Sequence, residues 1–141
     1  MDNQNNSTKQ KLILYVEDED FQAKIFSKII ENEVSSEKIK VIVFSNGNEF
    51  IDLLNSLHKQ YTLSDFSLIL LDLSMHDISG LEMLKESKNR SIQTPIAILT
   101  AREDEEVKKR SIDIGAQEYF VKGKNIEELA RLREFIIKSC N

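Results

Sequence analysis

The sequence contains one cysteine, Cys140, so no disulfide can form within the chain. A lone cysteine fits a reducing compartment. Long apolar runs are also missing, because stretches such as residues 68–71 are far shorter than the roughly 20 residues that a membrane-spanning helix needs. Residues 1–10 are polar and lack the apolar core of a signal peptide. We therefore expect a cytoplasmic protein with no membrane association and a disordered N-terminal tail over residues 1–10.

An excess of positive charge is absent as well. The chain has 19 lysines and arginines against 24 aspartates and glutamates, which gives a formal net charge of −5. A nucleic-acid-binding surface would show as a clustered excess of basic residues, so we expect no direct contact with nucleic acid. A length of 141 residues with 40% hydrophobic residues suits one domain with a single core, which we place at residues 11–139.

Apolar runs and amphipathic stretches alternate along the chain. Short apolar runs rich in strand formers predict strands over residues 12–16, 39–44, 66–72, 95–100 and 118–121. Apolar residues at helical spacing predict helices over residues 21–30, 50–57, 79–84, 103–114 and 126–138. Strands joined by helices imply a parallel sheet with right-handed crossovers and helices on both faces. The expected fold class is therefore α/β, a doubly wound (βα)₅ three-layer sandwich.

Several residues define these helices in detail. The apolar faces are expected to bury Phe21 in the first helix, Leu57 in the second and Ile126 in the last. Gly115 is expected to cap the end of the fourth helix, because glycine adopts the left-handed conformation that often ends a helix.

Chemically useful side chains follow four of the five predicted strands. They are Glu17 and Asp18 after the first, Asp72 after the third, Thr100 after the fourth and Lys122 after the fifth. In an open parallel sheet, ligands bind beyond the carboxyl ends of the strands, where the strand order reverses. We therefore expect these five side chains to meet at one edge.

Three carboxylates at one edge would repel one another and raise one another's pKa values. A hard divalent cation would relieve the repulsion, and oxygen ligands with room for water suit Mg²⁺. Each residue also has an ordinary explanation: Asp18 can begin a helix, Thr100 can cap one and Lys122 can be a solvated surface lysine. Five such residues at one end of a sheet favour a functional site over a coincidence.

These motifs resemble the receiver domains of bacterial two-component response regulators. The matching segments are residues 13–19, 68–80, 95–101 and 115–122, and the resemblance extends over residues 11–138. It implies a CheY-like, flavodoxin-like fold with strand order 2-1-3-4-5. It also implies a phosphoprotein that acts in signal transduction. Such a module is not an enzyme in the usual sense, because it catalyses only its own phosphorylation and dephosphorylation.

The resemblance assigns a role to each site residue. Asp72 matches the phosphoacceptor. Asp18 matches a direct ligand of Mg²⁺, and Glu17 matches a residue that holds the ion through water. Asp72 itself and the backbone carbonyl of Ser74 complete the implied metal site.

Three further residues match the family's phosphoryl-binding and switching positions. Thr100 matches the hydroxyl that moves toward the phosphoryl group, Lys122 the lysine that pairs with it, and Tyr119 the aromatic residue that turns inward on activation. We expect the relay to bias the surface of the fourth helix, fifth strand and fifth helix.

The implied partners are a sensor histidine kinase or a histidine phosphotransfer protein, and a downstream target protein or an effector domain. The chain is expected to be a monomer or a phosphorylation-dependent dimer, which Arg131, Arg133 and Glu118 could support.

Four features depart from the family pattern. His76 and Gly123 stand where the family usually has proline; we expect a surface loop histidine and a trans Lys122–Gly123 bond, since a cis bond without proline costs about 2.5–4 kcal/mol. Residues 47–72 are longer than usual, which predicts a longer second helix and loop around residues 58–65. Ser74 and Arg102 occupy the two positions that tune dephosphorylation in the family.

Three alternatives remain open at this point. A haloacid-dehalogenase-like phosphatase would carry a second aspartate two residues after the nucleophile, where this chain has Ser74. A flavodoxin-like cofactor carrier would need a phosphate loop rich in serine, threonine and glycine after the first strand, but residues 17–20 are all acidic. A degenerate receiver that acts only as a binding module is kept open by His76 and Gly123.

Overall fold

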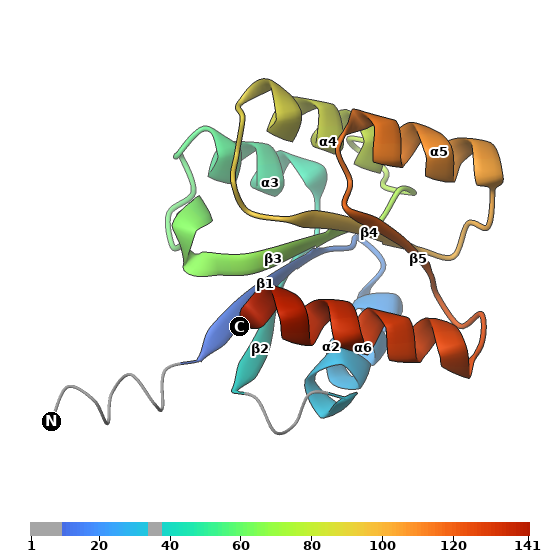
Figure 1. The fold of residues 1–141 in the computed structure, drawn as a ribbon. Helices are drawn as coiled ribbons and strands as arrows, with labels where there is room; N and C mark the ends of the chain where they lie inside the picture. Colours follow the sequence, from blue (N-terminus) through green and yellow to red (C-terminus); the bar gives the residue numbers. More distant parts are fainter. Residues whose placement is uncertain (1–9, 34–37) are drawn as a thin grey trace, which may run out of the picture.

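The structure, a computed structural model, describes residues 10–33 and 38–141. They form a five-stranded parallel sheet between two layers of helices (Figure 1). The strands are β1 (Lys11–Val16), β2 (Ile39–Phe44), β3 (Phe66–Leu71), β4 (Ile96–Thr100) and β5 (Glu118–Val121). Their order, β2-β1-β3-β4-β5, confirms the expected fold. The tail expected over residues 1–10 lies, apart from Gln10, outside the described residues.

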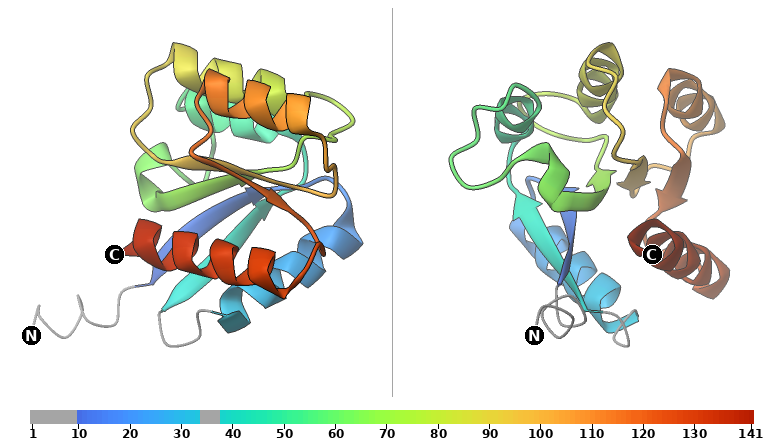
Figure 2. Two further views of the ribbon diagram at one scale, coloured as in Figure 1. Left: turned by 45° about the vertical axis from the view of Figure 1, so that its right-hand side comes forward. Right: turned by 60° about the vertical axis from the view of Figure 1, so that its left-hand side comes forward.

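In the described part of the chain, four helices and one 3₁₀ turn connect the strands, and a fifth helix follows the last strand. They are α2 (Asp20–Glu33), α3 (Gly47–Leu54), η1 (Leu63–Asp65), α4 (Gly80–Asn89), α5 (Glu105–Ile114) and α6 (Ile126–Cys140). Helices α2 and α6 cover one face of the sheet, and α3, α4 and α5 cover the other (Figures 1 and 2). Among the described residues, no helix is both long and apolar enough to cross a membrane.

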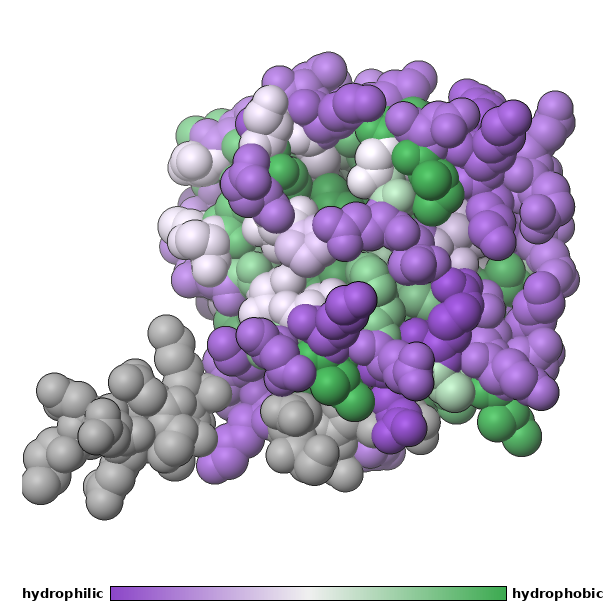
Figure 3. Space-filling view, viewed as in Figure 1, coloured by the Kyte–Doolittle hydropathy of each residue, from purple (hydrophilic) through white to green (hydrophobic). Residues whose placement is uncertain are grey.

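The central strand β3 is buried on both faces from Leu68 to Leu71, as this apolar run predicts. Leu68 and Leu70 pack in the core under α2 and α6. Ile69 and Leu71 pack in the core under α3, α4 and α5. Because successive side chains of a strand point to opposite faces, one run of four apolar residues supplies both cores. The outer surface seen in Figure 3 is mainly hydrophilic, and its hydrophobic residues lie in small groups between charged ones.

Polar caps fix where the helices begin. The side chains of Asn46, Ser79, Asp104 and Asn125 accept hydrogen bonds from main-chain N–H groups in the first turns of α3, α4, α5 and α6. Gly115 ends α5 with a φ of +141°, which confirms the expected glycine cap.

The second helix is shorter than the sequence pattern predicts. Helix α3 ends at Leu54, and Leu57 is 67% exposed, so the expected burial of Leu57 and the longer helix are wrong. The residues between α3 and η1 form a loop that is stabilised by contacts of His58. Its ring stacks on Phe44 at 4.6 Å between centroids, and its Nδ1 accepts the N–H groups of residues 60 and 61 at 3.2 Å each. Ring stacking and main-chain hydrogen bonds at His58 replace another helical turn.

Two expected core residues lie on the surface. Phe21 is 66% exposed and Ile126 is 82% exposed, so the prediction that both are buried is wrong. Each lies in the first turn of a helix that starts at the carboxyl edge of the sheet. The first turn extends past the ends of the strands, and a side chain there has no strand to pack on.

Gly80 packs against the main chain that carries Asp72. A Cβ atom at residue 80 would lie 2.5 Å from the Asp72 carbonyl oxygen and 2.7 Å from the Leu73 Cα. Helix propensity alone would make Gly80→Ala stabilising by about 1 kcal/mol. We expect it instead to destabilise the fold by about 1–3 kcal/mol, because backbone atoms must move. Urea unfolding measures the sign, with Lys85→Ala on the exposed side of α4 as the control.

Asp77 ties the loop after β3 to the start of α3. Its carboxylate accepts the N–H groups of Gly47 and Asn48 at 2.9 Å each. Burial opposes ionisation, but these hydrogen bonds outweigh it and lower the pKa of Asp77. A lowered folded-state pKa gives stability that is present above the unfolded pKa and is lost as the pH falls through the folded pKa.

We therefore expect Asp77→Ala to cost about 1 kcal/mol of unfolding free energy at pH 7 and less at pH 3. Urea unfolding at both pH values tests this, with Asp52→Ala on the exposed side of α3 as the control. A difference that stays constant between the two pH values would contradict the assigned role of the carboxylate.

Candidate functional site

The sheet brings the predicted site residues together at its carboxyl edge. Val16 pairs with Leu71 in neighbouring strands, so Glu17 and Asp72 leave the sheet side by side. The Asp72 N–H donates to the Val16 carbonyl at 3.1 Å. On the other side, the Lys122 N–H donates to the carbonyl of Thr100 at 2.7 Å.

Lys122 lies between two of the carboxylates. Its ammonium donates to Glu17 Oε1 and to Asp72 Oδ2, the latter at 2.7 Å. The Lys122 side chain is only 5% exposed, and both carboxylates are buried. Because isolated buried charges are costly, this close grouping of opposite charges is what allows all three to stay in the core.

The two carboxyl groups differ in acidity. Burial raises the pKa of Glu17, and the neighbouring Asp72 adds to the rise more than Lys122 opposes it. Burial also opposes ionisation of Asp72, but hydrogen bonding to Glu17, Lys122 and the Ser74 N–H outweighs it and lowers the pKa. Asp72 is therefore held as a carboxylate, the form that a nucleophile requires.

Both oxygens of Asp72 have fixed partners. Oδ2 accepts from Lys122, and Oδ1 accepts the Ser74 N–H at 3.0 Å. Ser74 thus contacts Asp72 through its N–H group, a contact that the sequence analysis did not predict. The loop after β3 thereby fixes the carboxylate orientation.

Tyr15 is a site residue that sequence reasoning missed. Its hydroxyl donates to Glu17 Oε1 at 3.1 Å, and burial followed by the charge of Glu17 raises its pKa. The Tyr15 hydroxyl therefore stays protonated and remains a donor. The sequence feature that could have identified Tyr15 is its position two residues before Glu17, because residues two apart in a strand point to the same side.

Asp18 contacts the loop after β3. Its Oδ2 accepts the main-chain N–H of His76 at 2.7 Å and lies 2.5 Å from His76 Nδ1. His76 is a surface loop residue, as expected, with a side chain that is 93% exposed. Its contact with Asp18 was not predicted, although a residue other than proline at this place supplies an N–H donor.

Thr100 and Tyr119 are linked through the main chain of Arg102. The Arg102 N–H donates to Thr100 Oγ1 at 3.3 Å, and the Tyr119 hydroxyl donates to the Arg102 carbonyl at 2.6 Å. Both side chains are buried. Beside the site, the Lys122–Gly123 bond is trans, and Gly123 has a φ of +65°, a conformation that favours glycine.

The donor chemistry at this edge fits a hard divalent cation. The carboxylates of Glu17, Asp18 and Asp72 and the Ser74 carbonyl supply only oxygen atoms, as Mg²⁺ prefers. Within residues 10–33 and 38–141, however, no three histidine, cysteine, aspartate or glutamate side chains are grouped as a metal site. In this arrangement Lys122 contacts Glu17 and Asp72, and Asp18 contacts His76.

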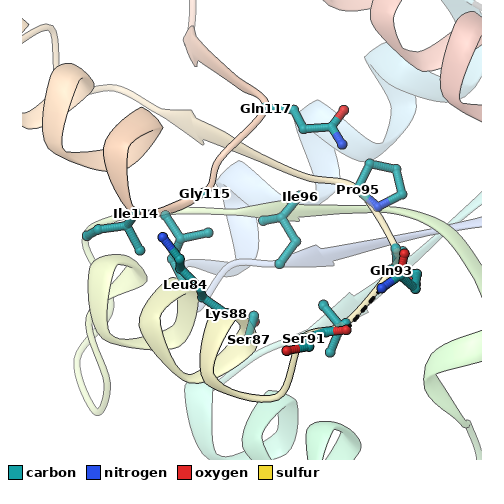
Figure 4. Close-up of a pocket in the computed structure, with 12 residues that line it drawn as sticks. Leu84, Ser87, Lys88, Ser91, Gln93, Pro95, Ile96, Ile114, Gly115 and Gln117 are labelled. Atoms are coloured by element: carbon teal, nitrogen blue, oxygen red, sulfur yellow. Dashed lines mark hydrogen bonds between the residues drawn. The ribbon is translucent and has the colours of Figure 1, made fainter.

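A separate hollow lies at the opposite edge of the sheet (Figure 4). It measures about 370 Å³ and is lined by residues that include Leu84, Lys88, Ile96 and Gln117. Ile96 is the first residue of β4, whereas Thr100 at the site is its last. No carboxylate lines this hollow, so the chemistry described above belongs to the carboxyl edge alone.

Known proteins resemble this chain in sequence and in fold. The family described as the response regulator receiver domain matches residues 13–133. The uncharacterized transcriptional regulatory protein YkoG of Bacillus subtilis is 38% identical over 122 residues, which cover 86% of this chain and 49% of that protein. Response regulator ArlR of Staphylococcus epidermidis is 37% identical over 122 residues, covering 86% of this chain and 50% of ArlR. The chain thus spans about half the length of these curated relatives.

Solved structures agree with the sequence comparisons. The phosphorylated cyanobacterial phytochrome response regulator RcpA superposes with a TM-score of 0.74 at 25% identity and covers 94% of each chain. The Mn²⁺-bound form of response regulator Rcp1 superposes with a TM-score of 0.67 at 25% identity, covering 89% of this chain and 91% of Rcp1. With a family match over most of its length, the chain belongs to the response regulator receiver domains, the signalling modules of two-component systems.

Proposed function

We propose that this receiver accepts a phosphoryl group on Asp72 in a Mg²⁺-dependent reaction and thereby switches an interaction surface. The observation that carries the proposal is the state of Asp72: a buried carboxylate with a lowered pKa whose two oxygens are held by Lys122 and the Ser74 N–H. Family membership supports a donor that is a sensor histidine kinase or a histidine phosphotransfer protein.

In the proposed transfer, an Asp72 oxygen forms a bond to phosphorus as the P–N bond of a phosphohistidine breaks. Charge develops on the three equatorial phosphoryl oxygens, so catalysis consists mainly of positioning and charge neutralisation. Lys122 already contacts Asp72 and supplies one positive charge. Mg²⁺, held by Glu17, Asp18, Asp72 and the Ser74 carbonyl, would supply further positive charge to the same oxygens.

Lys122 also offers a reason why the site is stable before phosphorylation. Its ammonium is shared between Glu17 and Asp72, so the acidic residues do not face one another uncompensated. In the proposal, Lys122 turns to a phosphoryl oxygen when the phosphoryl group is attached, and Glu17 would then be neutralised by the Mg²⁺ that it helps to hold. Glu17 and the phosphoryl group would thus each keep a positive partner, before and after phosphorylation.

The switch is proposed to run from Thr100 through Arg102 to Tyr119. A Thr100 hydroxyl that turns to bond the phosphoryl group gives up the Arg102 N–H, which it accepts here at 3.3 Å. The Arg102 carbonyl holds the Tyr119 hydroxyl at 2.6 Å, so movement of this residue changes the tyrosine's hydrogen bond. The affected surface is that of α5, β5 and α6, the fourth helix, fifth strand and fifth helix of the (βα)₅ pattern.

The partner of this surface is proposed to be a downstream target protein, an effector domain or a second copy of the chain. The curated relatives are about twice as long, and one is described as a transcriptional regulatory protein. On this face, Arg131 is paired within the chain, to Glu118 at 2.6 Å and Glu128 at 3.1 Å. The alternatives of a monomer and a phosphorylation-dependent dimer differ in whether these pairs are exchanged for pairs between copies.

Incubation with Mg²⁺ and acetyl phosphate is expected to add one phosphoryl group to the wild-type chain, seen by intact mass. Asp72→Asn, which removes the nucleophile and keeps its shape, should show no adduct, and neither should the wild type without Mg²⁺. Beryllofluoride binding serves as a second readout in case the adduct hydrolyses quickly. Neither adduct nor beryllofluoride binding in the wild type would favour a binding module that works without phosphorylation.

The relay predicts different behaviour for two variants of Thr100. Beryllofluoride is expected to shift the Tyr119 ring signals in the NMR spectrum of the wild type and of Thr100→Ser, which keeps the hydroxyl. Thr100→Ala should still bind beryllofluoride but lose most of the shift at Tyr119. Alanine has no hydroxyl group that could release the Arg102 N–H when beryllofluoride binds. A full shift in Thr100→Ala would rule out the relay and leave the phosphoacceptor role intact.

A further inference from the structure

His76 contacts Asp18 in a way that its surface position alone does not explain. Asp18 Oδ2 accepts the His76 main-chain N–H at 2.7 Å and lies 2.5 Å from the ring Nδ1. The Asp18 side chain is only 11% exposed, whereas the His76 side chain is 93% exposed. An exposed ring thus contacts a largely buried carboxylate.

We propose that His76 is a positioning residue that orients Asp18 for cation binding. Two donors from one residue hold Oδ2, which leaves Oδ1 available as the metal ligand. The inference rests on the proposed function, in which Asp18 is a direct ligand of Mg²⁺. Groups that hydrogen-bond to a metal ligand fix its orientation, and their loss typically lowers metal affinity by about 10–100-fold.

The identity of residue 76 makes this contact possible. Proline, the usual residue here in the family that the sequence resembles, has neither an N–H group nor a ring donor. Histidine supplies both, and both converge on the same oxygen of Asp18. The replacement of proline by His76 therefore adds an orienting contact to the metal ligand, besides making the turn after Asp72 less rigid.

The contacting ring atom provides a matched pair of variants. Nδ1 is bonded directly to Cγ, so the side-chain nitrogen of asparagine lies the same number of bonds from the main chain and can donate to Asp18. The side-chain nitrogen of glutamine corresponds to Nε2 and lies one bond farther out. His76→Asn should therefore keep the contact, whereas His76→Gln and His76→Ala should lose it. All three keep the main-chain N–H.

The test is the dissociation constant for Mg²⁺ alone, measured by isothermal titration calorimetry without a phosphodonor, with Mn²⁺ binding by electron paramagnetic resonance as a second readout. We expect His76→Ala and His76→Gln to bind about tenfold more weakly than the wild type, and His76→Asn within about threefold of it. Urea unfolding should be unchanged in all three, because the side chain is 93% exposed.

Two results would overturn the inference and are distinguishable. Equal or tighter Mg²⁺ binding by His76→Ala, with a wild type that binds Mg²⁺ and gains a phosphoryl group, would show that His76 does not orient Asp18 and would leave the proposed function standing. A wild type that binds neither Mg²⁺ nor Mn²⁺ would remove the metal site itself, and with it both the inference and the proposed chemistry.

Discussion

The site depends on one buried interaction, the ammonium of Lys122 between Glu17 and Asp72. Two carboxylates so close to the core would repel one another, and one would have to take up a proton. Hydrogen bonding to Glu17, Lys122 and the Ser74 N–H opposes the cost of burial, lowers the pKa of Asp72 and lets it remain ionised. Removing Lys122 would leave both buried carboxyl groups without their positive partner, so these three residues from three different strand ends depend on one another.

The orientation of this group is set by main-chain packing. Gly80 lies so close to the Asp72 carbonyl that no side chain fits between them, and the Ser74 N–H fixes one oxygen of Asp72. Asp77 links the same loop to the start of α3. The loop after β3 is thus held at both its ends, so the Asp72 carboxylate is presented in one orientation.

The same structure offers a route from the site to the surface. Thr100 and Tyr119 both bond to the main chain of Arg102, Thr100 to its N–H group and Tyr119 to its carbonyl. In the proposed relay, a change at the hydroxyl of Thr100 would reach Tyr119 as a displacement of the Arg102 main chain. His76 extends the site in the opposite direction, toward solvent, by contacting Asp18. In the proposed function, acceptance of the phosphoryl group, orientation of the cation ligand and signal output would each use different contacts of these loops.

The sequence alone determined the fold class and the position of Glu17, Asp18, Asp72, Thr100 and Lys122 at one edge, because apolar periodicity and strand ends are local properties that topology places predictably. It failed where tertiary contacts override local pattern: Leu57 and Ile126 have the right spacing for burial but no surface to pack on. Only the tertiary structure decided which partner each site residue takes. The contacts of Lys122 with Glu17 and of His76 with Asp18 join residues 105 and 58 positions apart. No periodicity encodes such pairs, since they arise from the register of β1, β3 and β5 and the path of the loop after β3.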